Sequence, residues 1–296
     1  MAFSSLEEIM EYMEKHHVHF WEAVLEDDLA QRDVTREASM EQMRYTWDAM
    51  LQASADYEPE RKSASSLAGG QGKQMETYCT SRTPLCGEFI GRVMTEALKT
   101  AESNACMKRI VAAPTAGASG VLPAVLIPYY ETHASQDETV LEAMYTAAGI
   151  GQVIALRASI SGAQGGCQAE IGSASAMAAG ALVSLEGGSG KQIIHAAAMA
   201  LKNLMGLVCD PVAGLVEIPC IKRNVIGAVN ALSSADMALA GIESRIPPDQ
   251  VIDAMKAVGD KMDTSLRETG MGGLAATPVG IEIMKQLKNH PSFGNS

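Results

Sequence analysis

The sequence of 296 residues contains few aromatic side chains: Phe, Trp and Tyr make up only 4% of it, although 47% of the residues are hydrophobic. Ala, Leu, Ile, Val and an unusual 18 Met must therefore fill the interior. That composition favours close-packed helices over a sheet sandwich, which is richer in Val, Thr and aromatic residues. We expect an all-α fold of one helical domain, residues 1–296, long enough to bury a large core.

Positive charge is also scarce in this chain. The 23 Lys and Arg are outnumbered by 35 Asp and Glu, and the net charge of −12 repels phosphate backbones, so we expect no nucleic-acid partner. The first ten residues lack an apolar signal core, and no apolar run of about 18 residues follows. We therefore expect a soluble, cytoplasmic protein that binds no membrane.

Helix start signals organise the chain. Polar, amphipathic segments predict N-terminal helices in residues 1–62, and residues 63–290 are expected to form the core. The start signals are Ser5 with Glu8, Thr35, Thr83-Pro84, Ser135 with Glu138, Ser189, Pro247-Pro248 and Thr277-Pro278. Gly206 is placed to close the helix that Ser189 opens. Residues 53–72 predict a loop, and residues 109–113 are at most a strand too short to anchor a sheet.

Two glycine-lysine segments are similar to phosphate-binding loops, but neither fits the pattern. Residues 185–192 (LEGGSGKQ) lack the first glycine and the terminal Ser or Thr, and residues 69–74 (GGQGKQ) lack the hydroxyl residue. Glycines that end one helix and precede the next explain residues 185–192 better than a phosphate-binding loop does. A pyridoxal phosphate enzyme would need a Schiff-base lysine and a phosphate cup, and nothing in the sequence positively indicates either.

The histidines give weak signals. His16, His17 and His19 lie within one helical turn without a flanking ligand pattern, which favours a solvated surface over a metal site. His195 lies in an apolar helical run, where a hydrogen-bonded core histidine is a more common outcome than a catalytic one.

The six cysteines fall into two groups according to their surroundings. Three are expected to be small buried hydrophobes: Cys79, Cys86 and Cys106. The other three lie in loop-like segments that contain Gly or Pro: Cys167, Cys209 and Cys220. Such backbones can bring thiolates together around an iron-sulfur cluster while their amides hydrogen-bond the sulfurs. Because no CxxC pair is present, the spacing alone is weak support, and loop cysteines at helix ends are the alternative.

Three thiolates around a four-iron cluster would leave one iron without a protein ligand. That Lewis acid can bind the hydroxyl and carboxylate of a substrate, and a positioned base can then remove the proton next to the carboxylate, which is the chemistry of a dehydratase. Because such a cluster is net negative, neutral donors must hold the carboxylate. The expected donors are Ser65 in the 63–70 loop and Thr115, Gly117 and Ser119 in the 114–120 turn. A purely structural helix-entry turn is the alternative for the second segment.

Five segments carry a family resemblance. They are residues 161–172 (SGAQGGCQAEIG), 206–216 (GLVCDPVAGLV), 219–224 (PCIKRN), 114–117 (PTAG) and 268–275 (ETGMGGLA). At these residues the chain closely resembles the α-chain family of bacterial iron-sulfur-dependent L-serine dehydratases, over nearly its whole length. The resemblance implies that Cys167, Cys209 and Cys220 hold a [4Fe-4S] cluster. It also implies an all-helical fold that converts L-serine to pyruvate and ammonia without pyridoxal phosphate.

The chain departs from the family pattern in two places. The family commonly reads Ser-x-Ser-Gly-Leu where residues 63–67 read SASSL, so Ser66 replaces the most permissive position of that loop. Single-chain relatives also carry an extra domain with a Ser-Ser-Ser-His-Thr segment and end in a cysteine, and both are missing here. We therefore expect the two-chain form of the enzyme, in which a β chain supplies that domain.

Two questions stay open at this point. The general base is not identified, and the candidates are His195, Lys73, Lys222, a serine, or a histidine of the partner chain. The alternative activity with the most similar chemistry is that of an L-cysteine desulfidase. Only a few atoms of the substrate pocket would distinguish such an enzyme from a serine dehydratase. A different class of function is a non-catalytic subunit that binds an iron-sulfur cluster or an amino acid.

Overall fold

The computed structural model describes residues 2–133 and 135–289, and the regular structure in them is helical. The α-helices are α1 (Leu6–His16), α2 (Phe20–Arg32), α3 (Arg36–Ala55), α4 (Gln71–Ser81), α5 (Gly87–Ala105), α6 (Val121–His133), α7 (Asp137–Arg157), α8 (Gly162–Gly165), α9 (Ser173–Leu185), α10 (Gly190–Asn203), α11 (Cys220–Leu239), α12 (Pro248–Lys261) and α13 (Pro278–Lys288). Short 3-10 turns are η1 (Ala116–Ala118), η3 (Val212–Gly214), η4 (Thr264–Leu266) and η5 (Gly273–Ala276), and η2 (Gln168–Gly172) is a π-helix.

The all-α prediction is confirmed. In the described ranges the β-type pairing is one isolated bridge, between Cys209 and Arg267, and residues 109–113 do not form the short strand considered above. Residues 290–296, the end of the expected domain, lie outside the described residues.

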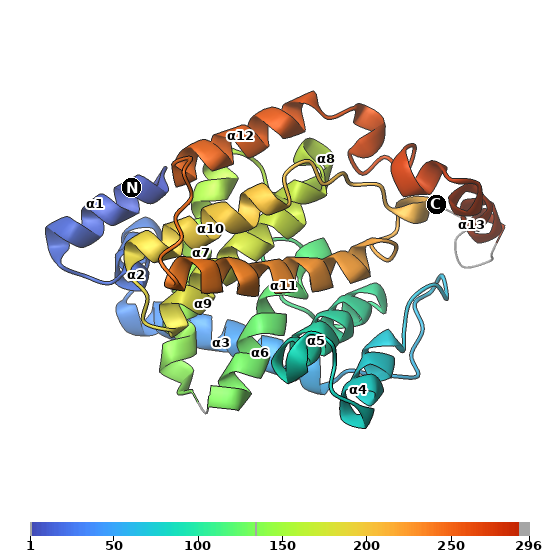
Figure 1. Cartoon of the computed structure of the whole chain (residues 1–296), viewed down its shortest axis with the longest axis horizontal. Coiled ribbons are helices and arrows are strands. Elements are labelled where there is room, and N and C mark those ends of the chain that lie inside the picture. Colours follow the sequence, from blue (N-terminus) through green and yellow to red (C-terminus); the bar gives the residue numbers. More distant parts are fainter. Residues whose placement is uncertain (1, 134, 290–296) are drawn as a thin grey trace.

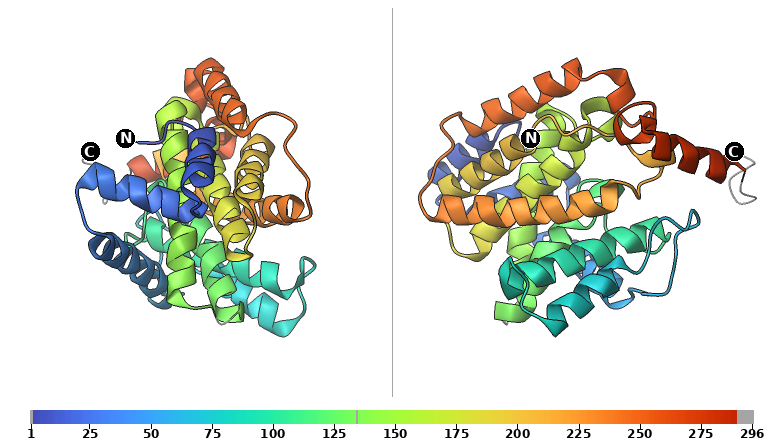
Figure 2. Two further views of the ribbon diagram at one scale, coloured as in Figure 1. Left: turned by 90° about the vertical axis from the view of Figure 1, so that its left-hand side faces the viewer. Right: turned by 45° about the vertical axis from the view of Figure 1, so that its right-hand side comes forward.

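Helix α9 forms the centre of the fold (Figure 1). Its sequence, SASAMAAGALVSL, offers small side chains on every face, and residues 173–183 are all buried. Helices α6, α7, α10 and α11 pack around α9, while α2 and α3 cover α7 and α12 lies on α10 (Figure 2). One continuous hydrophobic core extends through these layers from Leu6 to Met255. Small side chains let the helices approach closely, so the interior is filled with few aromatic rings.

The contact between α7 and α9 depends on a glycine. A Cβ built on Gly180 would lie 2.1 Å from Cδ1 of Ile150, which is closer than real atoms pack.

Helix α7 is long and apolar enough to cross a membrane by length and composition, but 67% of its most apolar stretch is buried inside the molecule. It therefore packs as a core helix of the bundle.

Most of the predicted helix starts are confirmed. The hydroxyls of Ser5, Thr35, Ser189 and Thr277 each accept a hydrogen bond from a backbone N–H in the first turn. Pro248 occupies the first position of α12. Each of these signals acts through contacts within one helical turn, which is why the local sequence suffices to predict them.

Two predicted helix starts are wrong. Helix α5 begins at Gly87, because Gly87 N donates to Pro84 O and the chain completes a turn before the helix. Ser135 does not cap α7, whose N-cap is Gln136 without a side-chain hydrogen bond. Gly206 has the expected positive φ of 87°, but α10 already ends at Asn203.

The predictions for the isolated cysteines and histidines have a mixed outcome. Cys106 is buried as expected, whereas Cys79 is half-buried and Cys86 is exposed, because Cys86 is the N-cap residue at the turn before α5. His16, His17 and His19 are exposed, which confirms the surface prediction for that group.

The loop between α3 and α4 shows how the chain accommodates Ser66. Ser66 has a φ of 63°, in the left-handed region, and its N donates to Ser63 O at 2.9 Å. The loop therefore has the backbone conformation that glycine adopts without strain. For a residue with a Cβ, that conformation costs about 1–2 kcal/mol.

We expect Ser66→Gly to raise the free energy of unfolding by up to about 1 kcal/mol. Glycine relieves the left-handed strain, and its greater chain entropy in the unfolded state cancels only part of that gain. Urea unfolding of the variant and the wild type measures the difference. Ser66→Ala serves as the control, because it removes the exposed hydroxyl but keeps the Cβ. A glycine variant less stable than the wild type would contradict the expectation.

We also expect Gly180 and Ile150 to be energetically coupled. Ile150→Val removes the Cδ1 atom that a Cβ at position 180 would meet. The Gly180→Ala change should therefore be better tolerated in the Ile150→Val background, by about 0.5–3 kcal/mol relative to additivity. Urea unfolding of both single variants and the double variant completes the cycle, and purely additive effects would show that the helices do not meet at this point.

Candidate active site

Three buried thiols from separate segments converge in the fold. Cys167 lies between α8 and η2, Cys209 in the loop after α10, and Cys220 at the first position of α11. Burial raises the pKa of Cys167 to about 11 and that of Cys220 to about 12, and it also raises the pKa of Cys209. Cys167 further raises the pKa of both other thiols by charge repulsion, which places the three sulfurs within electrostatic reach of one another.

Glycines leave room for this convergence. Gly166 has a φ of 75°, and a Cβ on it would lie 2.9 Å from Leu207 O. A Cβ on Gly162 would lie 2.9 Å from Cys209 Sγ and 2.7 Å from Glu170 Oε2. The π-helix η2 follows at once, and π-helical turns are frequent at functional sites.

Arg223 connects two of the cysteine segments. Its guanidinium donates to Val208 O at 2.7 Å and to Asp210 Oδ1 at 2.8 Å. It also lies near the Cys167 thiol, and its positive charge lowers the pKa of that thiol against the larger effect of burial. Asp210 in turn accepts from Leu274 N at 2.8 Å, so the ion pair extends to η5.

Asn224 connects the third cysteine to the 114–120 turn. Its Nδ2 donates to Gly117 O at 2.8 Å and to Cys220 O at 3.0 Å, and its Oδ1 accepts from Gly120 N at 2.9 Å. The predicted substrate turn is thereby fixed to the first turn of α11. Asn224 lies within a segment of the family resemblance, but the sequence alone gave it no role.

Glu170 lies between the turn and the thiols. Its Oε1 accepts from Thr115 Oγ1 at 2.8 Å, and its Oε2 is 4.0 Å from Cys209 Sγ. Burial raises the pKa of this carboxyl. A Cβ on Gly117 would lie 3.3 Å from Glu170 Oε1, a tight contact that only a small shift of the carboxylate would relieve. Glu170 is a second residue to which the sequence alone gave no role.

The predicted hydroxyl donors have different surroundings. Ser65 Oγ donates to Glu217 Oε2 at 2.6 Å and accepts from Leu67 N at 3.1 Å. Thr115 donates to Glu170, as described above. Ser119 Oγ is buried and has no hydrogen-bond partner in the described part of the chain.

The three numbered candidates for the general base have different partners. His195 accepts from Ser244 N at 3.2 Å, and burial lowers its pKa. Lys73 is exposed and pairs with Glu76 at 2.6 Å. Lys222 is exposed and donates to Gln71 Oε1 at 2.9 Å. Nothing in these contacts tests their catalytic role, and each stays a prediction.

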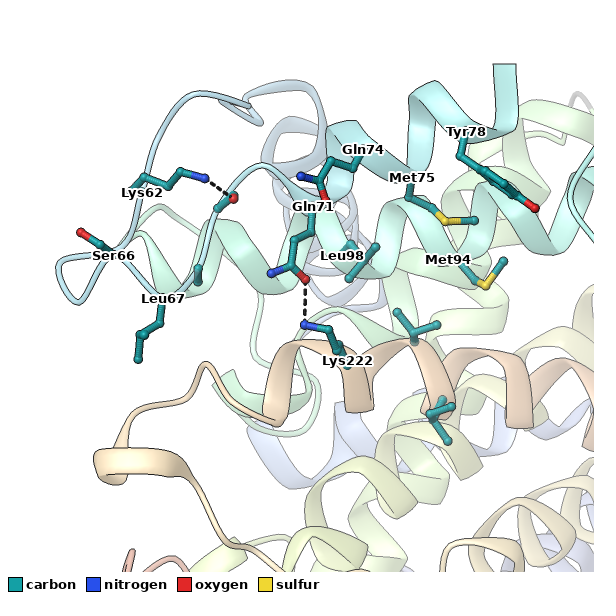
Figure 3. A pocket seen from close by; sticks show the side chains of 14 residues that line it. Lys62, Ser66, Leu67, Gln71, Gln74, Met75, Tyr78, Met94, Leu98 and Lys222 are labelled. Carbon is teal, nitrogen blue, oxygen red and sulfur yellow. Dashed lines mark hydrogen bonds between the residues drawn. The ribbon is translucent and has the colours of Figure 1, made fainter. Parts of the chain in front are cut away.

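Lys222 lines a cavity of about 890 Å³ between α4, α5 and α11 (Figure 3). The walls are mostly apolar side chains, including Met75, Met94 and Leu98. Lys62 closes one end and donates to Gly69 O at 2.6 Å. The cavity therefore lies alongside the 63–70 loop, on which Ser65 is located.

Three cysteine thiols are a donor set of the kind that iron-sulfur clusters use. In residues 2–133 and 135–289, no three His, Cys, Asp or Glu side chains are arranged to hold one metal ion. A four-iron cluster is larger, and each thiolate binds a different iron, so its ligands stand farther apart. The three thiols here are buried and come from separate segments, and the iron charge together with Arg223 would offset the charge of their thiolates.

Comparisons with known proteins place the chain among its relatives. Residues 15–275 match the family described as Serine dehydratase alpha chain. The chain is 45% identical over 285 residues to the probable L-serine dehydratase, alpha chain, of Bacillus subtilis (strain 168), covering 96% of this chain and 95% of that one. It is 42% identical over 281 residues to the L-serine dehydratase, alpha chain, of Peptoniphilus asaccharolyticus, covering 95% and 96%.

A longer relative matches as well. The L-serine dehydratase of Helicobacter pylori (strain ATCC 700392 / 26695) is 37% identical over 283 residues, which are 93% of this chain but only 62% of that protein. The match to the family covers all three converging cysteines and the residues that connect them. The chain therefore belongs to the serine dehydratase alpha chain family.

Proposed function

We propose that this chain is the catalytic α chain of an L-serine dehydratase, which converts L-serine to pyruvate and ammonia. We further propose that Cys167, Cys209 and Cys220 hold a [4Fe-4S] cluster. The observation that carries the proposal is the convergence of these three buried thiols beside the 114–120 turn. The names of the relatives support the substrate, since they are called L-serine dehydratases.

When bound, such a cluster supplies a Lewis acid at the iron that has no protein thiolate, which makes hydroxide a feasible leaving group. The chain itself would hold the rest of the substrate. Thr115, Gly117 and Ser119 are proposed to bind the carboxylate, together with Ser65. Arg223 would offset the negative charge of the thiolates through its contact with Cys167. Pyridoxal phosphate has no part in this proposal.

We also propose that a β chain completes the enzyme in the cytoplasm. Two relatives that this chain covers almost entirely are named alpha chains. The Helicobacter pylori relative is longer than the region it shares with this chain. All six cysteines are free thiols, as expected in a reducing compartment.

Anaerobic reconstitution tests the proposed function. The α chain, alone and with its β chain, is loaded with ferrous iron and sulfide, and pyruvate formation from L-serine is measured. We expect activity that air abolishes, that ferrous iron with thiol restores, and that carbonyl reagents do not affect. Activity that survives iron chelation but is lost with carbonyl reagents would contradict the cluster. Turnover by the β chain without any α chain would make this chain a non-catalytic subunit.

We expect Cys167→Ala, Cys209→Ala and Cys220→Ala each to lose the cluster. Each change removes one of the three proposed thiolate ligands, whereas Cys106→Ala removes an equally buried thiol elsewhere and should keep the iron. Iron and sulfide content and the visible absorption of anaerobic protein measure the outcome, with about four irons expected per wild-type chain. A requirement for Cys106 together with a dispensable Cys220 would contradict the ligand assignment.

We expect Thr115→Val to lower kcat/KM for L-serine by about 10²- to 10³-fold without loss of iron, because it removes one preorganised hydroxyl from the proposed carboxylate site. Thr46→Val is the control, since Thr46 is a half-buried threonine on α3 whose hydroxyl donates to Gln42 O of its own helix, away from the proposed site. Steady-state kinetics and iron content of both variants are compared with the wild type. Unchanged kinetics in Thr115→Val would assign this turn a structural role only.

A further inference from the structure

Glu217 is a buried carboxylate in the segment between η3 and α11, with 7% of its surface exposed. Ser63 and Ser65 both donate to its Oε2, at 3.0 and 2.6 Å, and the two serine oxygens are 2.9 Å apart. Glu217 therefore holds the 63–70 loop against the segment that leads to Cys220. Figure 3 shows this loop, with Ser66 and Leu67, beside the start of α11.

The two oxygens of Glu217 differ in their surroundings. Both serine hydroxyls bond Oε2, and within the described residues no donor bonds Oε1. Oε1 is not fully buried, so it keeps contact with solvent. No Lys, Arg or His of the described ranges forms an ion pair with Glu217. Oε1 is therefore an unused acceptor, and a cationic donor would pair with the carboxylate there.

Glu217 also borders the proposed substrate site. Its neighbour Val216 approaches the 114–120 turn, where a Cβ on Gly117 would lie 3.5 Å from Val216 Cγ1 and 3.3 Å from Glu170 Oε1. Glu217 thus lies between the two segments that are proposed to hold the substrate carboxylate. Within the described residues, Glu217 forms no hydrogen bond with the three cysteines that are the proposed cluster ligands.

The proposed substrate leaves one group without an acceptor. L-Serine carries a hydroxyl, a carboxylate and an α-ammonium group, and the first two are assigned above. The ammonium requires an anion or carbonyl acceptors. Glu170 is a poorer acceptor, because its Oε1 accepts from Thr115 and its Oε2 faces Cys209.

We propose that Glu217 Oε1 accepts a hydrogen bond from the α-ammonium group of L-serine, and that Ser63 and Ser65 fix the carboxylate for this contact. This inference rests on the proposed function. It makes Glu217 a specificity-determining residue, which selects α-amino acids over hydroxy acids that lack the ammonium. In this arrangement Ser65 acts on the substrate through Glu217, because its single O–H is donated to Oε2.

Glu102 provides a matched comparison. It is a buried carboxylate that also holds the 63–70 loop and the start of α4, but both of its oxygens are occupied. Oε1 accepts from Gly69 N and Gln71 N, and Oε2 accepts from Gly72 N and the Tyr57 hydroxyl. Glu102 therefore has no oxygen free for a ligand, and a change there affects the loop alone.

The test compares two ligands in two variants of the reconstituted holoenzyme. L-Serine has the ammonium group, and 3-hydroxypropanoate has the same hydroxyl and carboxylate without it. Glu217→Gln keeps an amide oxygen for the two serines but presents an N–H where Oε1 was. We expect it to raise KM for L-serine by about 10- to 100-fold and to leave the inhibition constant of 3-hydroxypropanoate nearly unchanged. Glu102→Gln should weaken both ligands in parallel.

The outcomes separate the inference from the proposed function. A wild-type holoenzyme that does not act on L-serine would overturn the proposed function itself. An active wild type in which Glu217→Gln weakens both ligands equally would overturn the ammonium contact and leave Glu217 as a loop anchor. If Glu217→Gln does not fold, Glu217→Asp replaces it. The shorter carboxylate should weaken L-serine more than 3-hydroxypropanoate, and equal weakening would contradict the inference.

Discussion

The guanidinium of Arg223 is the interaction on which the site depends. It donates to Val208 O and Asp210, its charge acts on the nearby Cys167 thiol, and Asp210 accepts from Leu274 N. This mostly buried ion pair thus connects helix α11, the Cys209 loop and the η5 turn. A buried pair of this kind tolerates the loss of neither member, because the remaining charge would be left without compensation. The position of the thiols is therefore set by electrostatics as much as by apolar packing.

The sequence predicted the features that arise within a few residues. The caps at Ser5, Thr35, Ser189 and Thr277 were correct because a hydroxyl and the N–H groups it accepts from lie within one turn. The helix start predicted at Thr83-Pro84 was wrong, because the same local sequence is equally compatible with a turn that ends at Gly87. Local signals cannot decide between two local solutions when tertiary packing favours one of them.

The candidate site was predictable only in part. Loop context and the resemblance singled out Cys167, Cys209 and Cys220, and the fold brings these thiols within electrostatic reach. The roles of Glu170 and Glu217 could not be read from the sequence, because each depends on partners far along the chain. Thr115 lies 55 residues from Glu170, and Ser65 lies 152 residues from Glu217. Such pairings are set by helix packing around α9, not by any local motif.

Asn224 uses both ends of its side chain to join two elements, the 117–120 backbone and the first turn of α11. These elements therefore share their conformational freedom: ordering one reduces the entropy that remains to be lost when the other is ordered. By thermodynamic reciprocity, whatever effect a ligand on the turn has on binding at Cys220 is returned by the same factor, even if the two ligands never touch. The side-chain amide is thus the direct physical link between the two halves of the candidate site.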